Sequence, residues 1–438
     1  EPVLLMRWSY YGETNLNHAF AARLRVNAVP GDPRFGGKTG QDLINHSFGR
    51  QIPSQKYGKE HPEYFALRDG KRLAPVENDW TQTEPCLTHP DVLRIVTEAV
   101  LAELKANPHK ENISVSQNDN ALHCQCPNCT AIDEREGTPM GSLLTFVNAV
   151  AEAVEREHPN VMVGTLSYWY SRKPPRTIRP RHNVQIQLCS IECCQFHAIS
   201  DPDCPPNRVF CADMDAWGRL TSNIFIWNYN TNFSAYHLPV PNLRIIERNV
   251  RYFVERGAKG IFMQAAGDTT GGEFSDLRNY LIANLLWDPQ RDGRRLIDEF
   301  LDLHYRSAAP PIRRYLNLLH DRTATGLHRN CYGDAAGFGV NEEIARVLTE
   351  AFEEAMRLAD DDEVRARVEK ASVIAYRAAL EPCWYLKPDQ KLDPETAARL
   401  RPAFEKYFAL CEKYQIQRVA EMELATDARK RLARHFEP

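Results

Sequence analysis

Short apolar runs alternate with longer amphipathic stretches along the N-terminal part of the chain. The runs are rich in β-branched and aromatic residues and are bounded by polar or turn-forming residues, which is typical of buried strands. They cover residues 3–11, 112–119, 161–168, 183–191, 223–231 and 260–266. Less certain strand candidates lie in 46–67, so the strand count approaches eight.

Between these runs, apolar residues recur every three or four positions, as on the buried stripe of a helix. The stripes are Leu144, Val147, Val150 and Val154 in 142–157, and Leu243, Ile246, Val250 and Phe253 in 242–256. A further helix is expected to begin near Pro90. Strands that alternate with helices in this way predict a parallel sheet with helices packed outside it.

The predicted fold is a (β/α)8 TIM barrel over residues 1–305, followed by a C-terminal helical domain over 306–438. The strand pattern stops near residue 306, and amphipathic stretches follow at 341–359, 363–386 and 394–414. A doubly wound sheet would show the same alternation. It ranks second, because the glycine-rich first turn that binds a dinucleotide is missing.

Composition narrows the class of protein. The 438 residues carry a formal net charge of −4 and no basic block interleaved with aromatics, so no nucleic-acid partner is expected. No apolar run of about 18 residues is present, so no membrane span is expected. The first residues lack the order of a signal peptide. We expect a mature chain with an extracytoplasmic location, periplasmic or secreted, and the oligomeric state stays open.

Two acidic residues follow predicted strands at similar depth. Asp119 ends the run 112–119, and Glu192 comes just after the run 183–191. Strand ends of a parallel barrel meet at the catalytic face, and glycoside hydrolysis needs two carboxyl groups there. Asn118 and Gln264 would be polar supports, with Asn118 polarising an acetamide if the sugar assists its own cleavage. The alternative is that these residues cap loops or form salt bridges.

Aromatic residues recur at the same strand ends. Sugars pack their C–H faces on such rings, while nearby amides and imidazoles bind hydroxyl groups. The expected sugar-binding residues are Tyr168, Trp227, Asn228, Tyr229, Asn232, Gln264, His197 and Asn118, with Trp169, Tyr170, Phe233, Tyr236 and His237 close by. Taken singly, each of these residues is more often a packing residue than a ligand contact.

Twelve cysteines are present, and several cluster in HCQCPNC (123–129) and IECC (191–194). The C-x-C-x-x-C pattern predicts a structural zinc site. Its expected ligands are Cys124, Cys126, Cys129 and Cys193, with His123 and Cys194 as other candidates for the fourth position. A disulfide or free buried thiols are the alternatives. A catalytic zinc is not expected because no HExxH motif is present, and no organic cofactor is expected.

Together these segments resemble a bacterial glycoside-hydrolase-like family long labelled a domain of unknown function. That family includes endo-β-N-acetylglucosaminidases acting on complex N-glycans and is more distantly similar to α-glucuronidases and β-hexosaminidases. The resemblance implies a (β/α)8 barrel acting on a carbohydrate. Its motifs are HPEYFAL (61–67), CLTHPDV (86–92), ISVSQNDN with CQCPNC (113–129), SLLTFVNAVAEAVE (142–155), SRKPPR (171–176), LCSIECCQFH (188–197), IWNYNTNFSAY (226–236), GGEFSDLRNYLIANLLWDP (271–289) and AAPPIRRYL (308–316).

One departure from the family pattern concerns the last predicted strand. The family commonly has a glutamate where GIFMQAA places Met263, and methionine cannot transfer a proton. Asp268 or Glu273 would have to replace that carboxyl. The sequence thus predicts a glycoside hydrolase with Asp119, Glu192 and Glu273 as candidate catalytic residues. The alternatives are an impaired barrel that binds a glycan, and a sugar lyase or redox enzyme, for which no cofactor motif is present.

Overall fold

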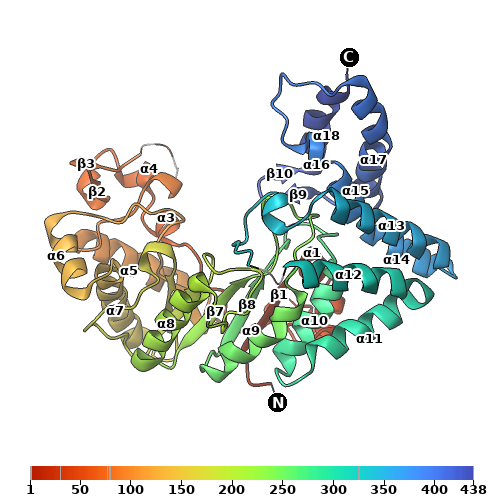
Figure 1. Cartoon of the computed structure of the whole chain (residues 1–438). Helices are drawn as coiled ribbons and strands as arrows, with labels where there is room; N and C mark the ends of the chain where they lie inside the picture. The colour runs from red at the N-terminus through yellow and green to blue at the C-terminus, as the bar shows by residue number, and fades with distance from the viewer. Residues whose placement is uncertain (1, 30, 76, 78–79, 324–325, 438) are drawn as a thin grey trace.

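The computed structural model describes residues 2–29, 31–75, 77, 80–323 and 326–437. Its centre is a curled sheet of six parallel strands in the order β1-β8-β7-β6-β5-β4 (Figure 1). All six of the clearer strand predictions are confirmed. The strands are β1 (Met6–Tyr10), β4 (Asn112–Ser114), β5 (Met162–Ser167), β6 (Val184–Cys189), β7 (Ile224–Tyr229) and β8 (Gly260–Gln264).

Helices pack against the outer face of this sheet. They are α5 (Pro90–Ala106), α7 (Met140–Glu157), α8 (Pro205–Leu220), α9 (Leu243–Glu255) and α10 (Ser275–Trp287). Both predicted apolar stripes are buried, in α7 and in α9. Each buried aliphatic side chain contributes about 1.5–3 kcal/mol through removal from water. A charge at Val147, which is fully buried in α7, would therefore disrupt the contact of this helix with the sheet.

The predicted count of eight strands is not confirmed, because the described residues between β1 and β4 add no strand to this sheet. The strand candidates in 46–67 are wrong, since Pro53 and Pro62 cannot donate to a sheet ladder. This part instead forms short helices and a separate two-stranded hairpin. The elements are α1 (Gly12–Asn15), α2 (His18–Arg23), α3 (Phe48–Gln51), α4 (Ser54–Tyr57), β2 (Leu67–Arg68) and β3 (Lys71–Arg72).

Backbone hydrogen bonds nevertheless link the segment after β1 to β1 itself and to the residue that precedes β4. The amide of Asn27 donates to the carbonyl of Arg7 in β1, and the amide of Thr39 donates to the carbonyl of Asn27. Just before β4, the amide of Glu111 donates to the carbonyl of Gly40. The open side of the sheet is therefore spanned by irregular backbone.

Helices dominate the rest of the chain, as predicted. They are α11 (Gly293–Tyr305), α12 (Ala309–Thr323), α13 (Glu342–Leu358), α14 (Asp362–Ala371), α15 (Val373–Ala379), α16 (Glu381–Trp384), α17 (Pro394–Lys413) and α18 (Ala425–Ala433). The single stretch expected at 363–386 is divided into α14, α15 and α16. Among the described residues, no helix has the length and apolar composition needed to cross a bilayer. The domain boundary at residue 306 stays a prediction.

A hairpin that the sequence did not predict returns the C-terminal region to the sheet. Its strands are β9 (Arg418–Ala420) and β10 (Glu423–Leu424). The amide of Tyr236 donates to the carbonyl of Val419, and the amide of Glu421 donates to the carbonyl of Phe233. Figure 1 shows this hairpin between the sheet and the helices α15 to α18. Residues 418–424 therefore border the loops that follow the strands.

Candidate functional site

The face formed by the residues that follow the carboxyl ends of the six strands is called the mouth here, and Asp119 lies on it. Its side chain is 48% exposed. The hydroxyl of Tyr168, just after β5, donates to Asp119 Oδ1 at 3.0 Å, and His46 Nε2 lies 3.8 Å from the same oxygen. Burial raises the pKa of Tyr168, and the charge of Asp119 raises it further. Tyr168 therefore stays a proton donor to a carboxylate that solvent and substrate can reach.

His46 completes this arrangement on the other side of Asp119. Its Nδ1 lies 2.8 Å from the carbonyl oxygen of Gln117, so Nδ1 carries the hydrogen and Nε2 faces Asp119. Burial lowers the pKa of His46, although the carbonyl of Gln117 and the charge of Asp119 oppose that effect. A neutral imidazole beside Asp119 does not cancel the charge of that carboxylate at neutral pH.

Two exposed indoles lie near His46 and Tyr168, the residues that flank Asp119. Trp169 is 51% exposed and has a backbone φ of 51°, a left-handed conformation that bulky residues rarely adopt. Trp80 is also exposed, and its ring lies 5.9 Å from that of His46. Such strain persists only where surrounding contacts impose it, and it is common at ligand sites. The Trp169 ring lies 6.2 Å from that of Tyr168, so each exposed indole lies near a residue that flanks Asp119, and sugar faces pack against such rings.

Glu192, the second predicted carboxylate, follows β6 and forms an ion pair. Its Oε2 lies 2.8 Å from Arg172, which also pairs with Asp213 at 2.8 Å. The charges of Glu192 and Asp119 both raise the pKa of the Cys189 thiol, after the larger effect of burial. Both carboxylates therefore lie near the end of β6, but Glu192 is already engaged by a guanidinium.

A third carboxyl group at the mouth, Glu421, was not predicted from the sequence. It sits on the β9–β10 hairpin, and the hydroxyl of Tyr332 donates to its Oε2 at 3.1 Å. Burial raises the pKa of Glu421, and the charges of Asp119 and Asp268 raise it further, whereas Tyr332 and Arg418 act in the opposite direction. Glu421 is therefore easier to protonate than a freely solvated glutamate.

Several predicted sugar-binding residues are instead buried and bonded to the protein. The Asn118 side chain accepts from the amide of Gly49 and donates to the carbonyl of Thr83. Asn228 accepts from Ser190 Oγ, and Asn232 donates to the carbonyl of Gly333. Tyr229 and His237 are buried as well. Their positions favour a role in holding the strand-end loops.

Trp227 and Gln264 lie on the inner face of the curled sheet. The indole Nε1 of Trp227 donates to Gln264 Oε1 at 2.6 Å. Both residues line a cavity of about 360 Å³ that extends from β1 and β8 to β4. Asp119, Glu192 and Glu273 are not among the residues that line this cavity.

Glu273 and Met263 are both buried. Glu273 is 2% exposed and accepts from Arg278 Nε at 2.7 Å. Burial raises the pKa of Glu273, while Arg278 opposes that rise. Met263 is 0% exposed, and its sulfur lies 3.7 and 3.6 Å from the side-chain amides of Asn228 and Asn230. Glu273 thus has the position of a structural ion pair, and Met263 contributes no group to the mouth.

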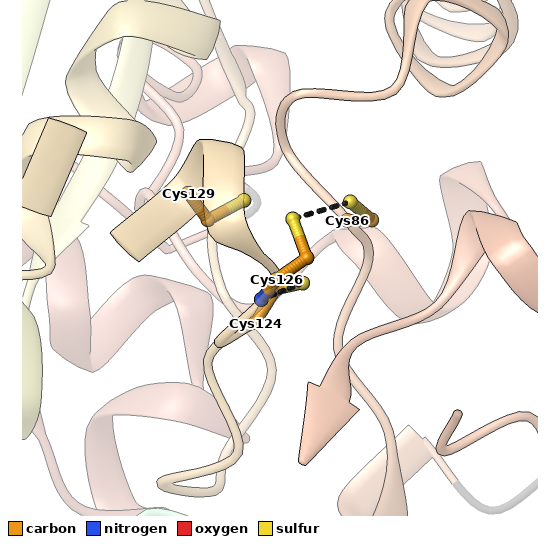
Figure 2. A group of neighbouring side chains, drawn as sticks. All are labelled: Cys86, Cys124, Cys126 and Cys129. Atoms are coloured by element: carbon orange, nitrogen blue, oxygen red, sulfur yellow. Dashed lines mark hydrogen bonds between the residues drawn. The ribbon is translucent and has the colours of Figure 1, made fainter. Parts of the chain in front are cut away.

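Four buried cysteines from two segments bring their sulfur atoms together (Figure 2). The sulfurs of Cys86, Cys124, Cys126 and Cys129 all lie within 4.8 Å of one another. Backbone amides of Leu67 and Cys126 point at the sulfur of Cys124, at 3.3 and 3.5 Å. Amides that point at a sulfur favour a thiolate there.

The helix that follows strengthens the same tendency. Cys126 is the N-cap of α6 (Pro127–Glu136), and Cys129 lies in its first turn, where the helix dipole stabilises negative charge. All twelve cysteines are free thiols in the structure. Four converging sulfurs have the donor chemistry of a metal site.

The predicted fourth ligand, Cys193, is wrong. Cys193 packs in the main hydrophobic core, whereas the four converging cysteines form a separate small cluster with Ala66. Cys86 supplies the fourth sulfur. It stands in the motif CLTHPDV, but its spacing from Cys124 carries no metal-binding signature, so only the fold identifies it. His197 was predicted to bind sugar, but in the structure its Nδ1 lies 3.3 Å from Cys194 Sγ.

Comparisons with known proteins place the chain in a family. No curated protein matches it. The solved structure of a GH138 enzyme targeting pectin rhamnogalacturonan II is similar over 98% of this chain, with 9% identical residues and a TM-score of 0.38, and the similarity covers 64% of that chain. A family model described as Domain of unknown function (DUF4838) matches residues 1–317. Because this match covers most of the chain, the protein belongs to the DUF4838 family.

Proposed function

We propose that this protein is a glycoside hydrolase that cleaves a glycan at the mouth of the sheet. The observation that carries the proposal is that the mouth holds an exposed carboxylate, Asp119, and a second carboxyl, Glu421, whose pKa is raised by burial. Glycoside cleavage needs one group to protonate the leaving oxygen and another to act on the anomeric carbon or on a water. An exposed carboxylate and a partly buried carboxyl whose pKa is raised suit this division of roles.

In this mechanism Asp119 is the anionic group. The hydroxyl of Tyr168 orients its Oδ1, and the neutral His46 does not neutralise its charge. Asp119 then acts as base or nucleophile toward a sugar packed against Trp169. If the sugar is an N-acetylhexosamine, the same Asp119 and Tyr168 pair would orient the acetamide that attacks the anomeric carbon.

Glu421 is the proposed proton donor, in preference to Glu192. A general acid must hold its proton at working pH and release it to the leaving oxygen. Glu421 accepts a hydrogen bond from Tyr332 and lies in the field of two other carboxylates. Glu192 is held by Arg172 at 2.8 Å, an arrangement that suits a charged group that orients substrate.

Leaving-group dependence tests these roles. On a natural glycan, we expect Asp119→Asn and Glu421→Gln each to lower kcat/KM by about 10²–10⁴-fold. On an aryl glycoside with an acidic phenol leaving group, Glu421→Gln should lose less than about tenfold, because that phenolate departs without protonation. Asp119→Asn should show the full loss of about 10²–10⁴-fold on both substrates.

The matched control is Glu423→Gln, two residues away on β10, where Glu423 pairs with Arg431. Its activity should equal that of the wild type. Glu192→Gln loses activity on both substrates if Glu192 is the orienting group, but behaves as predicted for Glu421→Gln if it is the acid. A panel of complex N-glycans and other glycans, with and without N-acetyl groups, identifies the substrate class. Binding to that panel without turnover would favour the glycan-binding alternative.

We also propose that Cys86, Cys124, Cys126 and Cys129 hold a structural zinc ion. The four sulfurs are buried and converge within 4.8 Å, which suits tetrahedral thiolate coordination. The ion would brace residues 120–129, which follow Asp119 directly. Protein purified without added metal should contain zinc that Cys129→Ser loses, with a fall in stability of about 3 kcal/mol or more. Wild-type protein that folds and remains metal-free after zinc is offered would refute this site.

A further inference from the structure

A second group of metal-type ligands lies after β6, away from the four converging cysteines. The ligand atoms of Cys194, His197, Cys204 and His328 all lie within 4.8 Å of one another. Cys194 Sγ is 3.3 Å from His197 Nδ1, and Cys204 Sγ is 3.4 Å from His328 Nδ1. The two imidazole rings lie 4.7 Å apart. We propose that these four residues bind a second zinc ion.

The distances fit tetrahedral coordination. With Zn–S bonds of about 2.3 Å and Zn–N bonds of about 2.0 Å, neighbouring ligand atoms in a tetrahedron lie about 3.3–3.8 Å apart. Both measured sulfur–nitrogen distances fall in this range before any ligand moves. Two cysteines and two histidines are also a ligand set that zinc favours in structural sites.

The local backbone has two features in common with the first cysteine cluster: a cysteine at the N-cap of a helix and an amide that points at a sulfur. Cys204 is the N-cap of α8, with a proline at the first helical position, just as Cys126 is the N-cap of α6. The amide of Phe196 points at Cys194 Sγ at 3.3 Å, as the amide of Cys126 points at Cys124. Both places therefore combine a cysteine at a helix start with a backbone amide that points at a sulfur.

Hydrogen bonds from α8 hold the loop that carries three of these ligands. The side chain of Asn207 in α8 accepts from the amide of Cys194 at 2.8 Å and donates to the carbonyl of His197 at 3.1 Å. Such contacts fix the orientation of ligands before the metal binds. Cys194 and Cys204 are buried, while His328 is exposed, so an ion can enter from the side of His328.

The ion would tie two distant parts of the chain together. His328 lies beyond α12, whereas the other three ligands belong to the loop between β6 and α8. Beside it, the amide of Gln195 donates to the carbonyl of Arg329 at 2.7 Å. Tyr332, four residues after His328, reaches the mouth through its bond to Glu421. Zinc at this place would hold residues 326–333 against the loop after β6, independently of any catalytic role.

Metal counting by mass spectrometry tests the proposal on the full chain, purified under reducing conditions and loaded with zinc. We expect two zinc ions per chain in the wild type, one in His328→Ala, one in Cys204→Ser and one in Cys129→Ser. His328→Ala is the most informative variant because this side chain is exposed and its loss should not prevent folding. His182→Ala, at another exposed histidine, is the matched control and should keep two ions.

Two further measurements separate this site from the first. Cobalt(II) bound to Cys129→Ser should show thiolate charge-transfer intensity from two sulfurs, about half that of cobalt bound to the four-cysteine site in His328→Ala. Hydrogen exchange at residues 326–333 should be faster in His328→Ala than in the control. The proposal would be overturned if His328→Ala and Cys204→Ser both retained two zinc ions. It would also be overturned if Cys194 and Cys204 formed a disulfide in protein purified under reducing conditions.

Discussion

Tyr168 and Asp119 meet at the ends of neighbouring strands, and the phenol donates to Asp119 Oδ1 at 3.0 Å. The two residues are 49 positions apart in the chain, but β4 and β5 pair in parallel and place their carboxyl ends together. This contact fixes one oxygen of Asp119 and leaves the other side of the carboxylate open to the mouth. The direction of that carboxylate therefore depends on a group from the adjacent strand.

Tyr168→Phe should weaken catalysis without preventing folding. A hydrogen bond to a charged group contributes about 1.5–3 kcal/mol, so we expect kcat/KM to fall by about 10–100-fold. Asp119 is half-exposed, so water replaces the lost donor and the melting temperature should change little. Kinetics on a hydrolysed glycan measure the effect. Unchanged kcat/KM would show that the phenol does not orient the catalytic carboxylate.

Glu421→Gln should stabilise the protein at neutral pH but not in acid. Burial and the charges of Asp119 and Asp268 raise the pKa of Glu421, against Tyr332 and Arg418. The folded protein then holds this proton more tightly than the unfolded chain does. The stability from Glu421 is therefore complete below the carboxyl's ordinary pKa of about 4.3 and is lost as pH rises through the raised value.

Glutamine keeps the shape of the protonated acid at every pH. Urea unfolding at a pH of about 4 should give the same free energy of unfolding for wild type and Glu421→Gln, and at about pH 7 a larger one for the variant. Glu423→Gln should show no such divergence, because Glu423 is ion-paired with Arg431. A Glu421→Gln variant that is less stable than wild type at neutral pH would contradict the raised pKa.

The strands and outer helices were predictable because burial repeats along the sequence with a fixed period. The apolar stripe from Leu144 to Val154 marks a helix, and the apolar run 183–191 marks a strand. In each case a single element packs against a neighbouring layer, so its pattern is regular. The segment 46–67 failed because its apolar residues pack from short helices broken by Pro53 and Pro62. Such packing leaves no period in the sequence.

The residues of the candidate site were predictable only where they lie close in sequence to a predicted strand or to one another. Asp119 comes five residues after the end of β4, whereas Glu421 lies on a hairpin far along the chain. Cys86 and His328 were missed for the same reason, since a metal ligand from a distant segment has no spacing to its partners. Conversely, Asn228 and Glu273 have the right residue types after the right strands, but both are engaged in buried contacts.

Met263→Glu should not create or restore activity. The side chain is fully buried, and a carboxyl there would meet the amides of Asn228 and Asn230 rather than the mouth. Burying it should cost about 2–4 kcal/mol, whereas Met263→Leu, a swap of similar volume, should cost less than about 1.5 kcal/mol. Thermal unfolding and activity assays measure both variants. A gain of turnover in Met263→Glu would instead show that this position reaches the substrate.

Substitutions of Trp169 test substrate binding and backbone strain separately. Its indole is half-exposed and its φ is 51°, so its backbone conformation costs about 1–2 kcal/mol in any residue except glycine. Trp169→Gly should therefore be more stable than Trp169→Ala by roughly 1 kcal/mol, despite glycine's larger entropy loss on folding.

Both variants lose the same sugar platform, which is expected to raise KM by about tenfold with little change in kcat. Chemical unfolding gives the difference in stability, and steady-state kinetics give the KM. If the two variants bind a glycan as tightly as wild type, the ring of Trp169 does not contact the sugar. If Trp169→Ala is the more stable of the two, the left-handed backbone is not a source of strain. If both comparisons give the expected results, the strained turn after β5 presents an indole to the sugar.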